Sequence, residues 1–169
     1  MRSLSLIAAV IASAALAACA GTPRPSVANA HGTMKPYQVR GQWYVPKDDP
    51  RYDEVGIASW YGPQHQGRPT ADGEIFDMRR ASAAHKTLPL PCIVEVRNLE
   101  NGRKIRVRVN DRGPFKKDRI IDLSQEAARE LGFLDKGTAK VRVRYIGRAQ
   151  AMEEDGEARV YAQADPAGQ

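Results

Sequence analysis

Cysteine is scarce in this 169-residue chain, which contains only Cys19 and Cys92. At most one disulfide can form, so a framework of several bridges holding together a small loop-rich domain is excluded. Leu88, Leu90 and Ile93 surround Cys92 and indicate a small, buried apolar side chain at that position. A catalytic thiol is the less favoured alternative.

Several patterns that mark active sites are also missing. The three histidines, His31, His65 and His85, are scattered, and none has a carboxylate three or four residues away with which it would share a helix face. A zinc site is therefore not expected. The sequence has no glycine-rich phosphate loop and no nucleophile elbow, and nothing in it suggests a dissociable cofactor.

Long apolar runs are absent except at the N-terminus. Residues 4–18 are free of charge but short and rich in small residues, which is typical of an export signal rather than a membrane-spanning helix. The stretch ends in Leu16-Ala17-Ala18-Cys19, which resembles the lipobox of bacterial lipoproteins. We therefore expect residues 1–18 to be removed and Cys19 to carry lipid; the alternative is an ordinary secretory signal with a chance cysteine. Ala20, in place of Asp, favours the periplasmic face of the outer membrane.

Acidic residues are in the minority, with 20 Asp and Glu against 26 Lys and Arg and a formal net charge of +6 at pH 7. A basic balance favours an anionic partner. For an exported protein the candidates are membrane headgroups and the carboxylates of the cell wall, and nucleic acid is not expected.

Composition divides the chain into segments. Residues 19–53 are dominated by proline, glycine and small polar residues and are expected to be a linker from the lipid to a folded domain. Trp43 and Tyr44 are too apolar for a simple tether, so the end of the linker is expected to dock on the domain as an extended arm. The domain is expected over residues 54–148 and an acidic, disordered tail over residues 149–169.

Short strands separated by turn residues are expected in the domain. Residues 95–99 alternate in character, Asn101-Gly102 is a hairpin-turn dipeptide, and residues 105–109 alternate again with a basic outer face. Residues 141–145 repeat the pattern. One short helix is expected from a cap at Asp122 to Gly132, so the fold class is mainly β with short helices, in a closed barrel or a sandwich.

Three polar residues, Glu74, His85 and Asp111, are the candidates for chemistry. A period of two places Asp111 with the inward-facing set of residues 105–109 if the strand continues that far, and a partly desolvated carboxyl suits a general acid. The residues alone leave open a plainer interpretation: Asp111 caps a turn, Glu74 is a solvated turn residue and His85 packs through hydrogen bonds. The pair Trp60-Tyr61 could stack on sugar rings, although such residues at a strand end are more often core.

Five sequence blocks resemble the successive signatures of the RlpA (rare lipoprotein A) family, in the same order. They are GIASWYG at 56–62, GRPTADGE at 67–74, AAHKTLP at 83–89, VNDRGPF at 109–115 and RIIDLS at 119–124. The resemblance implies a six-stranded double-psi β-barrel, related in fold to the expansins. It also implies lytic transglycosylation of peptidoglycan glycan strands stripped of their peptides, with the important family positions falling on Glu74, His85 and Asp111.

The chain departs from the family pattern in two places. His65-Gln66 stands where many members have Phe-His, which changes one wall of the expected groove. The C-terminal SPOR domain of many members is not expected, because few residues follow the barrel.

The resemblance implies a mechanism with one catalytic carboxyl. Asp111 is expected to protonate the glycosidic oxygen and then to remove the proton of the sugar's C6 hydroxyl, with His85 and Glu74 lining the groove. Trp60, Tyr61 and Arg112 are expected to bind the glycan. Two other functions stay open: a non-catalytic glycan-binding or wall-loosening module like the expansins, and a structural lipoprotein that scaffolds division or envelope proteins.

Overall fold

The computed structural model describes residue 25 and residues 32–150. The expectations for the signal over residues 1–18, for lipid on Cys19 and for nearly all of the tail fall outside these described residues. Within them, no helix is both long enough and apolar enough to cross a membrane.

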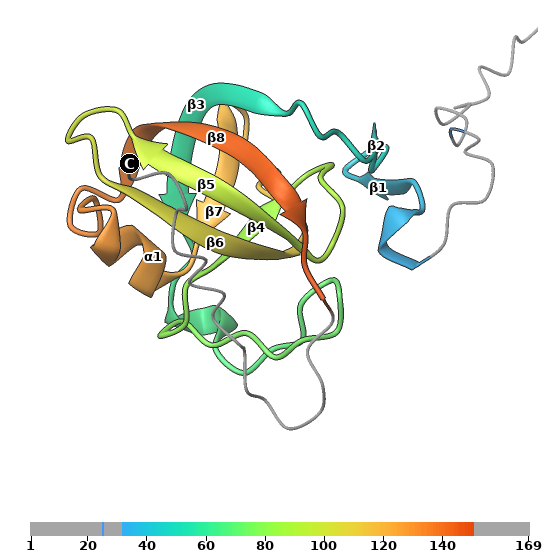
Figure 1. Cartoon of the computed structure of the whole chain (residues 1–169). Coiled ribbons are helices and arrows are strands. Elements are labelled where there is room, and N and C mark those ends of the chain that lie inside the picture. The colour runs from blue at the N-terminus through green and yellow to red at the C-terminus, as the bar shows by residue number, and fades with distance from the viewer. Residues whose placement is uncertain (1–24, 26–31, 151–169) are drawn as a thin grey trace, which may run out of the picture.

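Six strands close into a barrel in the order β3-β7-β4-β6-β5-β8 (Figure 1). Their bounds are β3 (Asp53–Trp60), β4 (Ser82–His85), β5 (Cys92–Asn98), β6 (Lys104–Asp111), β7 (Arg119–Leu123) and β8 (Thr138–Arg148). The pairs β3–β7 and β4–β6 are parallel and the other four are antiparallel. The mainly-β, six-stranded double-psi barrel is therefore confirmed, and the sandwich alternative is wrong.

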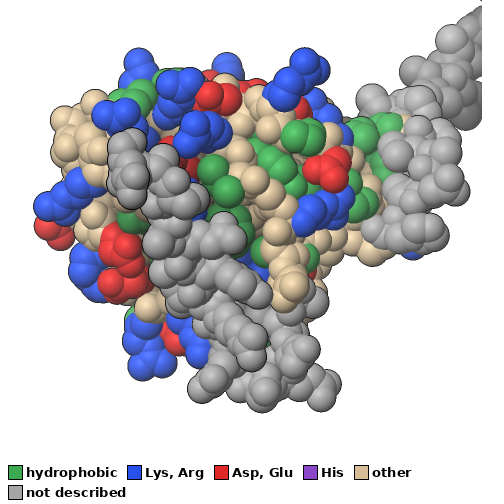
Figure 2. All heavy atoms as spheres, in the orientation of Figure 1, with side chains coloured by type: hydrophobic (Ala, Val, Ile, Leu, Met, Phe, Trp, Pro, Cys, Tyr) green, Lys and Arg blue, Asp and Glu red, His purple; other side chains and the backbone are tan. Residues whose placement is uncertain are grey.

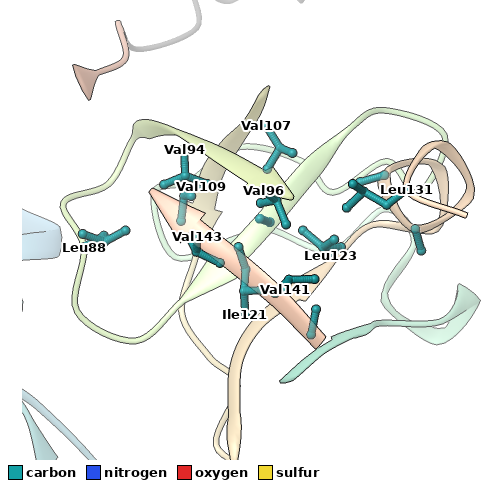
Figure 3. Close-up of a cluster of buried hydrophobic side chains, with 14 of the residues drawn as sticks. Leu88, Val94, Val96, Val107, Val109, Ile121, Leu123, Leu131, Val141 and Val143 are labelled. Carbon is teal, nitrogen blue, oxygen red and sulfur yellow. The ribbon is translucent and has the colours of Figure 1, made fainter. Parts of the chain in front are cut away.

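Alternating apolar residues of the strands fill the barrel. Figure 3 shows aliphatic side chains from several strands pointing toward one another. The labelled set is Leu88, Val94, Val96, Val107, Val109, Ile121, Leu123, Leu131, Val141 and Val143, and all of these are at most 1% exposed. Cys92 belongs to the same core, and burial raises the pKa of its thiol to about 12, so it is a neutral core residue as expected.

The helices are short: η1 (Gly32–Met34), η2 (Pro63–His65) and α1 (Gln125–Glu130). Ser124, not Asp122, is the N-cap of α1, because its hydroxyl accepts a hydrogen bond from Ala127 N at 3.3 Å. The predicted cap at Asp122 is wrong, since that residue belongs to strand β7. Gly132 does follow the helix, with a φ of +73° that favours glycine.

Part of the expected linker is an ordered arm. Strands β1 (Tyr37–Val39) and β2 (Gln42–Tyr44) form a hairpin beside the barrel (Figure 1). The Tyr37 hydroxyl donates to Lys86 O at 2.7 Å, and Tyr37 and Tyr44 both pack against Phe115. These contacts supply the apolar burial that proline-rich and glycine-rich residues could not provide alone.

Basic side chains are spread over the outside of the barrel. In the orientation of Figure 1, Figure 2 shows Lys and Arg side chains along the upper rim, with acidic side chains among them. Arg142 and Arg144 of β8 are paired with Asp53 and Glu95. The positive charge is therefore distributed and partly neutralised.

Candidate functional site

A β-bulge sets the direction of Asp111. In the β4–β6 pair, Ala83 is opposite Val109 and Ala84 is opposite Asp111, so β6 has one extra residue, Asn110. Val109 and Ala83 belong to the core, whereas Ala84 follows on the other face of β4. The expectation that Asp111 joins the inward-facing set is wrong, because the bulge turns it to the outer face with Ala84.

The Asp111 carboxyl is half-buried and held from one side. Its Oδ1 accepts hydrogen bonds from Ala71 N at 3.0 Å and from Arg112 N at 2.8 Å. Oδ2 accepts no hydrogen bond from any residue that the structure describes. One oxygen therefore fixes the carboxyl while the other stays available to a ligand.

The loop of residues 67–76 brings Ala71 to Asp111. It closes through a bridge between Pro69 and Ile75 and through Thr70 N, which donates to Glu74 O at 2.8 Å. Asp72 N donates to Asn110 O at 3.2 Å, which ties the loop to the bulge of β6.

Glu74 lies in this loop and is an ion-pair partner. Arg108 Nε donates to its Oε1 at 2.8 Å, a terminal Arg108 nitrogen also contacts Oε1, and Asn110 Nδ2 donates to Oε2 at 2.9 Å. Burial acts to raise the pKa of Glu74, but the hydrogen bonds from Arg108 and Asn110 outweigh it and hold the pKa below its usual value. Glu74 is thus a fixed anion that anchors the loop near Asp111.

Asp72 is a residue that the sequence analysis did not single out. Its Oδ1 accepts hydrogen bonds from Thr70 Oγ1 at 2.7 Å and from Glu74 N at 3.2 Å, whereas its Oδ2 is buried without a partner among the described residues. Burial, together with the neighbouring Glu74 charge, raises the pKa of Asp72. An Asp-Gly dipeptide is an ordinary turn signal, so nothing in the pattern of residues distinguishes Asp72 from a solvated turn residue.

His85 is placed away from Asp111. Its Nδ1 accepts hydrogen bonds from Thr87 N at 3.2 Å and Leu88 N at 3.0 Å, so the proton is on Nε2, which donates to Tyr52 Oη at 2.9 Å. Residue 85 follows Ala84 on β4, and its ring therefore lies on the opposite side of the strand from Asp111. Burial lowers the pKa of His85 to about 3, so the ring is neutral. These contacts match the plainer interpretation of His85 as a hydrogen-bonded packing residue.

The Arg112 guanidinium contacts backbone carbonyls. It donates to Leu88 O at 2.6 Å, to His85 O at 3.2 Å and to Thr33 O at 2.7 Å, and it lies 5.7 Å from the centre of the Tyr37 ring. These contacts tie the arm to the β4–β5 connection. Glycan binding by Arg112 stays a prediction, and these contacts favour a structural role instead.

The two aromatic candidates differ in position. Trp60 packs on the core and its Nε1 donates to Leu134 O at 3.1 Å. Tyr61 packs against Phe76 at 4.5 Å between ring centres, and its hydroxyl is buried next to the Ser82 hydroxyl. Burial raises the pKa of Tyr61, as do the charges of Asp111 and Asp122, whereas the Ser82 side chain lowers it.

Asp122, which had the pattern of a helix cap, lies on β7 and makes side-chain contacts near this site. Its carboxylate accepts a hydrogen bond from Ser59 Oγ at 2.6 Å and pairs with Arg119 at 3.0 Å. Burial raises its pKa. In residue 25 and residues 32–150, no group of three or more His, Cys, Asp or Glu side chains is arranged to hold a metal ion.

Residues 53–143, more than half of the chain, match the protein family described as "Lytic transglycolase". The chain belongs to this family of double-psi β-barrel proteins.

Its curated relatives carry the name endolytic peptidoglycan transglycosylase RlpA. The protein of Pseudomonas aeruginosa (strain UCBPP-PA14) is 53% identical over 123 residues, which cover 71% of this chain and 36% of that protein. The protein of Helicobacter pylori (strain ATCC 700392 / 26695) is 50% identical over 125 residues, covering 73% of this chain and 40% of that protein. The chain therefore spans less than half the length of these relatives.

Solved structures of similar shape include two kinds of protein. Streptomyces papain inhibitor is 29% identical, with a TM-score of 0.49, over 59% of this chain and 99% of that one. An expansin from Clavibacter michiganensis is 22% identical, with a TM-score of 0.47, over 60% of this chain and 53% of that one.

Proposed function

We propose that this chain is a lytic transglycosylase that cleaves peptidoglycan glycan strands, with Asp111 as its catalytic carboxyl. Membership of the lytic transglycolase family and the names of the RlpA relatives support the reaction class. The observation that carries the assignment to Asp111 is its carboxyl on the outer face of the barrel, with Oδ1 fixed by two backbone N–H groups and Oδ2 unbonded by the described residues.

The reaction needs proton transfer at two places. As the bond from N-acetylmuramic acid breaks, the leaving oxygen must gain a proton, and the C6 hydroxyl that closes on C1 must lose one. Because the nucleophile is part of the substrate, no second carboxylate is required to position a water molecule. In the simplest scheme, Asp111 gives the first proton and takes the second.

Glu74 supports this chemistry through its fixed position. Its ion pair with Arg108 and its bond from Asn110 hold the loop that delivers Ala71 N to Asp111. Its low pKa makes it a poor proton donor near neutral pH. We assign it as a positioning residue, and we assign neutral His85 to the same class because its ring supports the β4–β5 connection.

The reaction class is tested by digesting peptide-stripped glycan strands with the purified full chain in water enriched in oxygen-18, followed by mass spectrometry. A transglycosylase produces 1,6-anhydro ends without the heavy isotope, because no water is added. Reducing ends that carry oxygen-18 would indicate a hydrolase. Intact strands that sediment with the protein would instead indicate a non-catalytic binding module.

The substrate preference and the location are further parts of the proposal. We expect strands without peptides to be cleaved faster than intact sacculi, and Cys19 to carry lipid that holds the protein at the periplasmic face of the outer membrane. Metabolic labelling with an alkyne analogue of palmitate tests the anchor. A lipid anchor on Cys19 is supported if the wild type is labelled and the Cys19→Ser variant is not. Equal labelling of the two proteins rejects it.

A further inference from the structure

Asp111 and Asp122 lie on the two strands that flank β4. Ala84 of β4 is opposite Asp111 of β6 on one side and opposite Asp122 of β7 on the other. Directly opposed residues of neighbouring strands point to the same face of a sheet. Strand spacing of about 4.8 Å therefore places the two carboxyl-bearing positions about 10 Å apart on the outer face of the barrel.

Tyr61 lies beside the strand that carries Asp122. Its backbone N–H donates to Leu123 O of β7 at 3.0 Å, and the charges of Asp111 and Asp122 both act to raise the pKa of its phenol. Both carboxyls are partly accessible, and the Asp122 side chain is 14% exposed. A sugar bound over Tyr61 could contact both.

The surroundings of Asp122 contain unused hydrogen-bonding capacity. Arg119 Nε is buried and has no partner among the described residues, and Tyr61 Oη and Ser82 Oγ are buried next to each other with no other described partner. Ser82 is two residues before Ala84 on the same face of β4, and Arg119 pairs with Asp122. Buried polar atoms are rarely left unpaired, so the cluster around Asp122 has donors and acceptors to offer a polar ligand.

We infer that Asp122 is a second catalytic carboxyl, which donates the proton to the glycosidic oxygen while Asp111 removes the proton from the C6 hydroxyl. This inference rests on the proposed function and divides its two proton transfers between two groups. Partial burial, which favours the protonated form of Asp122, supports the assignment.

The Asp122 proton passes to the glycosidic oxygen as the C1–O bond breaks, and the bonding pair leaves with that oxygen on the departing sugar. The C6 oxygen forms a bond to C1, and its proton passes to the Asp111 carboxylate. Proton exchange with water then returns Asp122 to its acid form and Asp111 to its carboxylate.

A plainer role for Asp122 is to hold β7 in place through Ser59 and Arg119. The two roles are distinguished by comparing a substrate whose leaving group needs a proton with one whose leaving group does not. One substrate is peptide-stripped glycan; the other is the 4-nitrophenyl glycoside of a GlcNAc–MurNAc disaccharide, whose leaving group departs without a proton. Asp122→Asn is expected to lower kcat/KM on glycan about 100-fold or more and to leave aryl glycoside cleavage within about threefold of wild type. Asp111→Asn is expected to be slow on both substrates. The control Asp135→Asn, at an exposed carboxylate before β8, is expected to cleave both at the wild-type rate.

A second variant tests the inference without altering Asp122. The Ser59 hydrogen bond lowers the pKa of Asp122, so Ser59→Ala is expected to raise it and to move the alkaline limb of the glycan pH profile to higher pH. The titratable groups that act on Asp122 are Arg119, Lys86 and His65, and all three are unchanged in this variant. Thermal melting of each variant confirms that it is folded.

Wild-type rates on glycan for Asp122→Asn, equal losses on both substrates in a folded variant, or an unmoved alkaline limb in Ser59→Ala would overturn the inference alone. If Asp122→Asn does not fold, the Ser59→Ala profile decides. A wild-type chain that produces no anhydro ends from either substrate would overturn the proposed function, and the inference with it.

Discussion

Glu74 and Asp72 are two residues apart in one loop, yet their pKa values shift in opposite directions. Arg108 and Asn110 donate to Glu74 and favour its charged form, whereas Asp72 has a buried oxygen without a partner among the described residues. Because the folded pKa of Glu74 lies below its usual 4.5, its ionisation stabilises the fold above that pH, and this stabilisation is lost as pH falls through the folded value.

Glu74→Gln is therefore expected to reduce both stability and activity at neutral pH. Arg108 would lose its partner in a largely buried position, at a cost of about 1–3 kcal/mol, and the loop would hold Ala71 less firmly against Asp111. Urea unfolding and anhydro-end release measure the two effects. Glu100→Gln, at an exposed pair with Lys136, should cost less than about 1 kcal/mol. Equal stability of the two variants, or a difference from wild type that does not shrink below pH 4.5, would contradict this account.

His85→Asn is expected to make the protein less sensitive to acid. His85 is neutral when folded, so wild type loses stability as pH falls below the ordinary value of 6.5 toward about 3, by up to about 1.4 kcal/mol per pH unit. Asn cannot titrate, but its side-chain oxygen can replace Nδ1 as acceptor for Thr87 and Leu88. Unfolding free energies from pH 7 to 4 should thus fall less steeply in the variant, and the exposed-site control His65→Asn should follow wild type. Parallel curves for all three proteins would show that His85 does not carry the effect.

The sequence identified the positions of several site residues but not their directions. Asp111 was found as a carboxyl after a strand, but the bulge at Asn110 depends on pairing with β4, which is far away in sequence. The same holds for His85, whose ring direction is set by Tyr52. Asp122 was misassigned because an acidic residue before a short amphipathic segment has the pattern of a helix cap.

At the scale of elements, the local turn signals were reliable. The Asn101-Gly102 hairpin joins β5 to β6, with a φ of +75° at Gly102, and the alternating segments at 95–99, 105–109 and 141–145 fall in or at the edge of β5, β6 and β8. Strand β7 was not predicted, because its neighbours β3 and β4 are distant in sequence and no hairpin-turn dipeptide precedes it. The order of the strands around the barrel follows from such long-range pairs and came only from the family resemblance.

Ser124→Ala is expected to destabilise the junction of β7 and α1 by about 1–2 kcal/mol. The hydroxyl accepts hydrogen bonds from Ala127 N in the helix and from Ser82 N in β4, so both donors would be left unpaired in a buried site. Chemical unfolding measures the loss. Thr138→Ala, at an exposed hydroxyl at the start of β8, should change stability by less than about 0.5 kcal/mol. A Ser124→Ala variant as stable as this control would remove Ser124 from the capping role.

For the whole molecule, the net charge of +6 predicts an electrostatic contribution to wall binding. Binding to purified sacculi should weaken as salt rises from about 50 to 300 mM, since the screening length of exposed charges falls from about 14 to about 6 Å over this range. Sacculi whose carboxylates have been amidated should bind less protein at low salt and show little salt dependence. Binding that is equally strong under all these conditions would show that charge does not drive it.

The central claim is that the barrel presents Asp111 as the carboxyl that cleaves glycan strands, and the most direct test is the rate of anhydro-end release by Asp111→Asn. The account predicts a loss of about 100-fold or more, with melting temperature and glycan binding unchanged and with Asp135→Asn at the wild-type rate. An Asp111→Asn variant that releases anhydro ends within a few fold of the wild-type rate would contradict it.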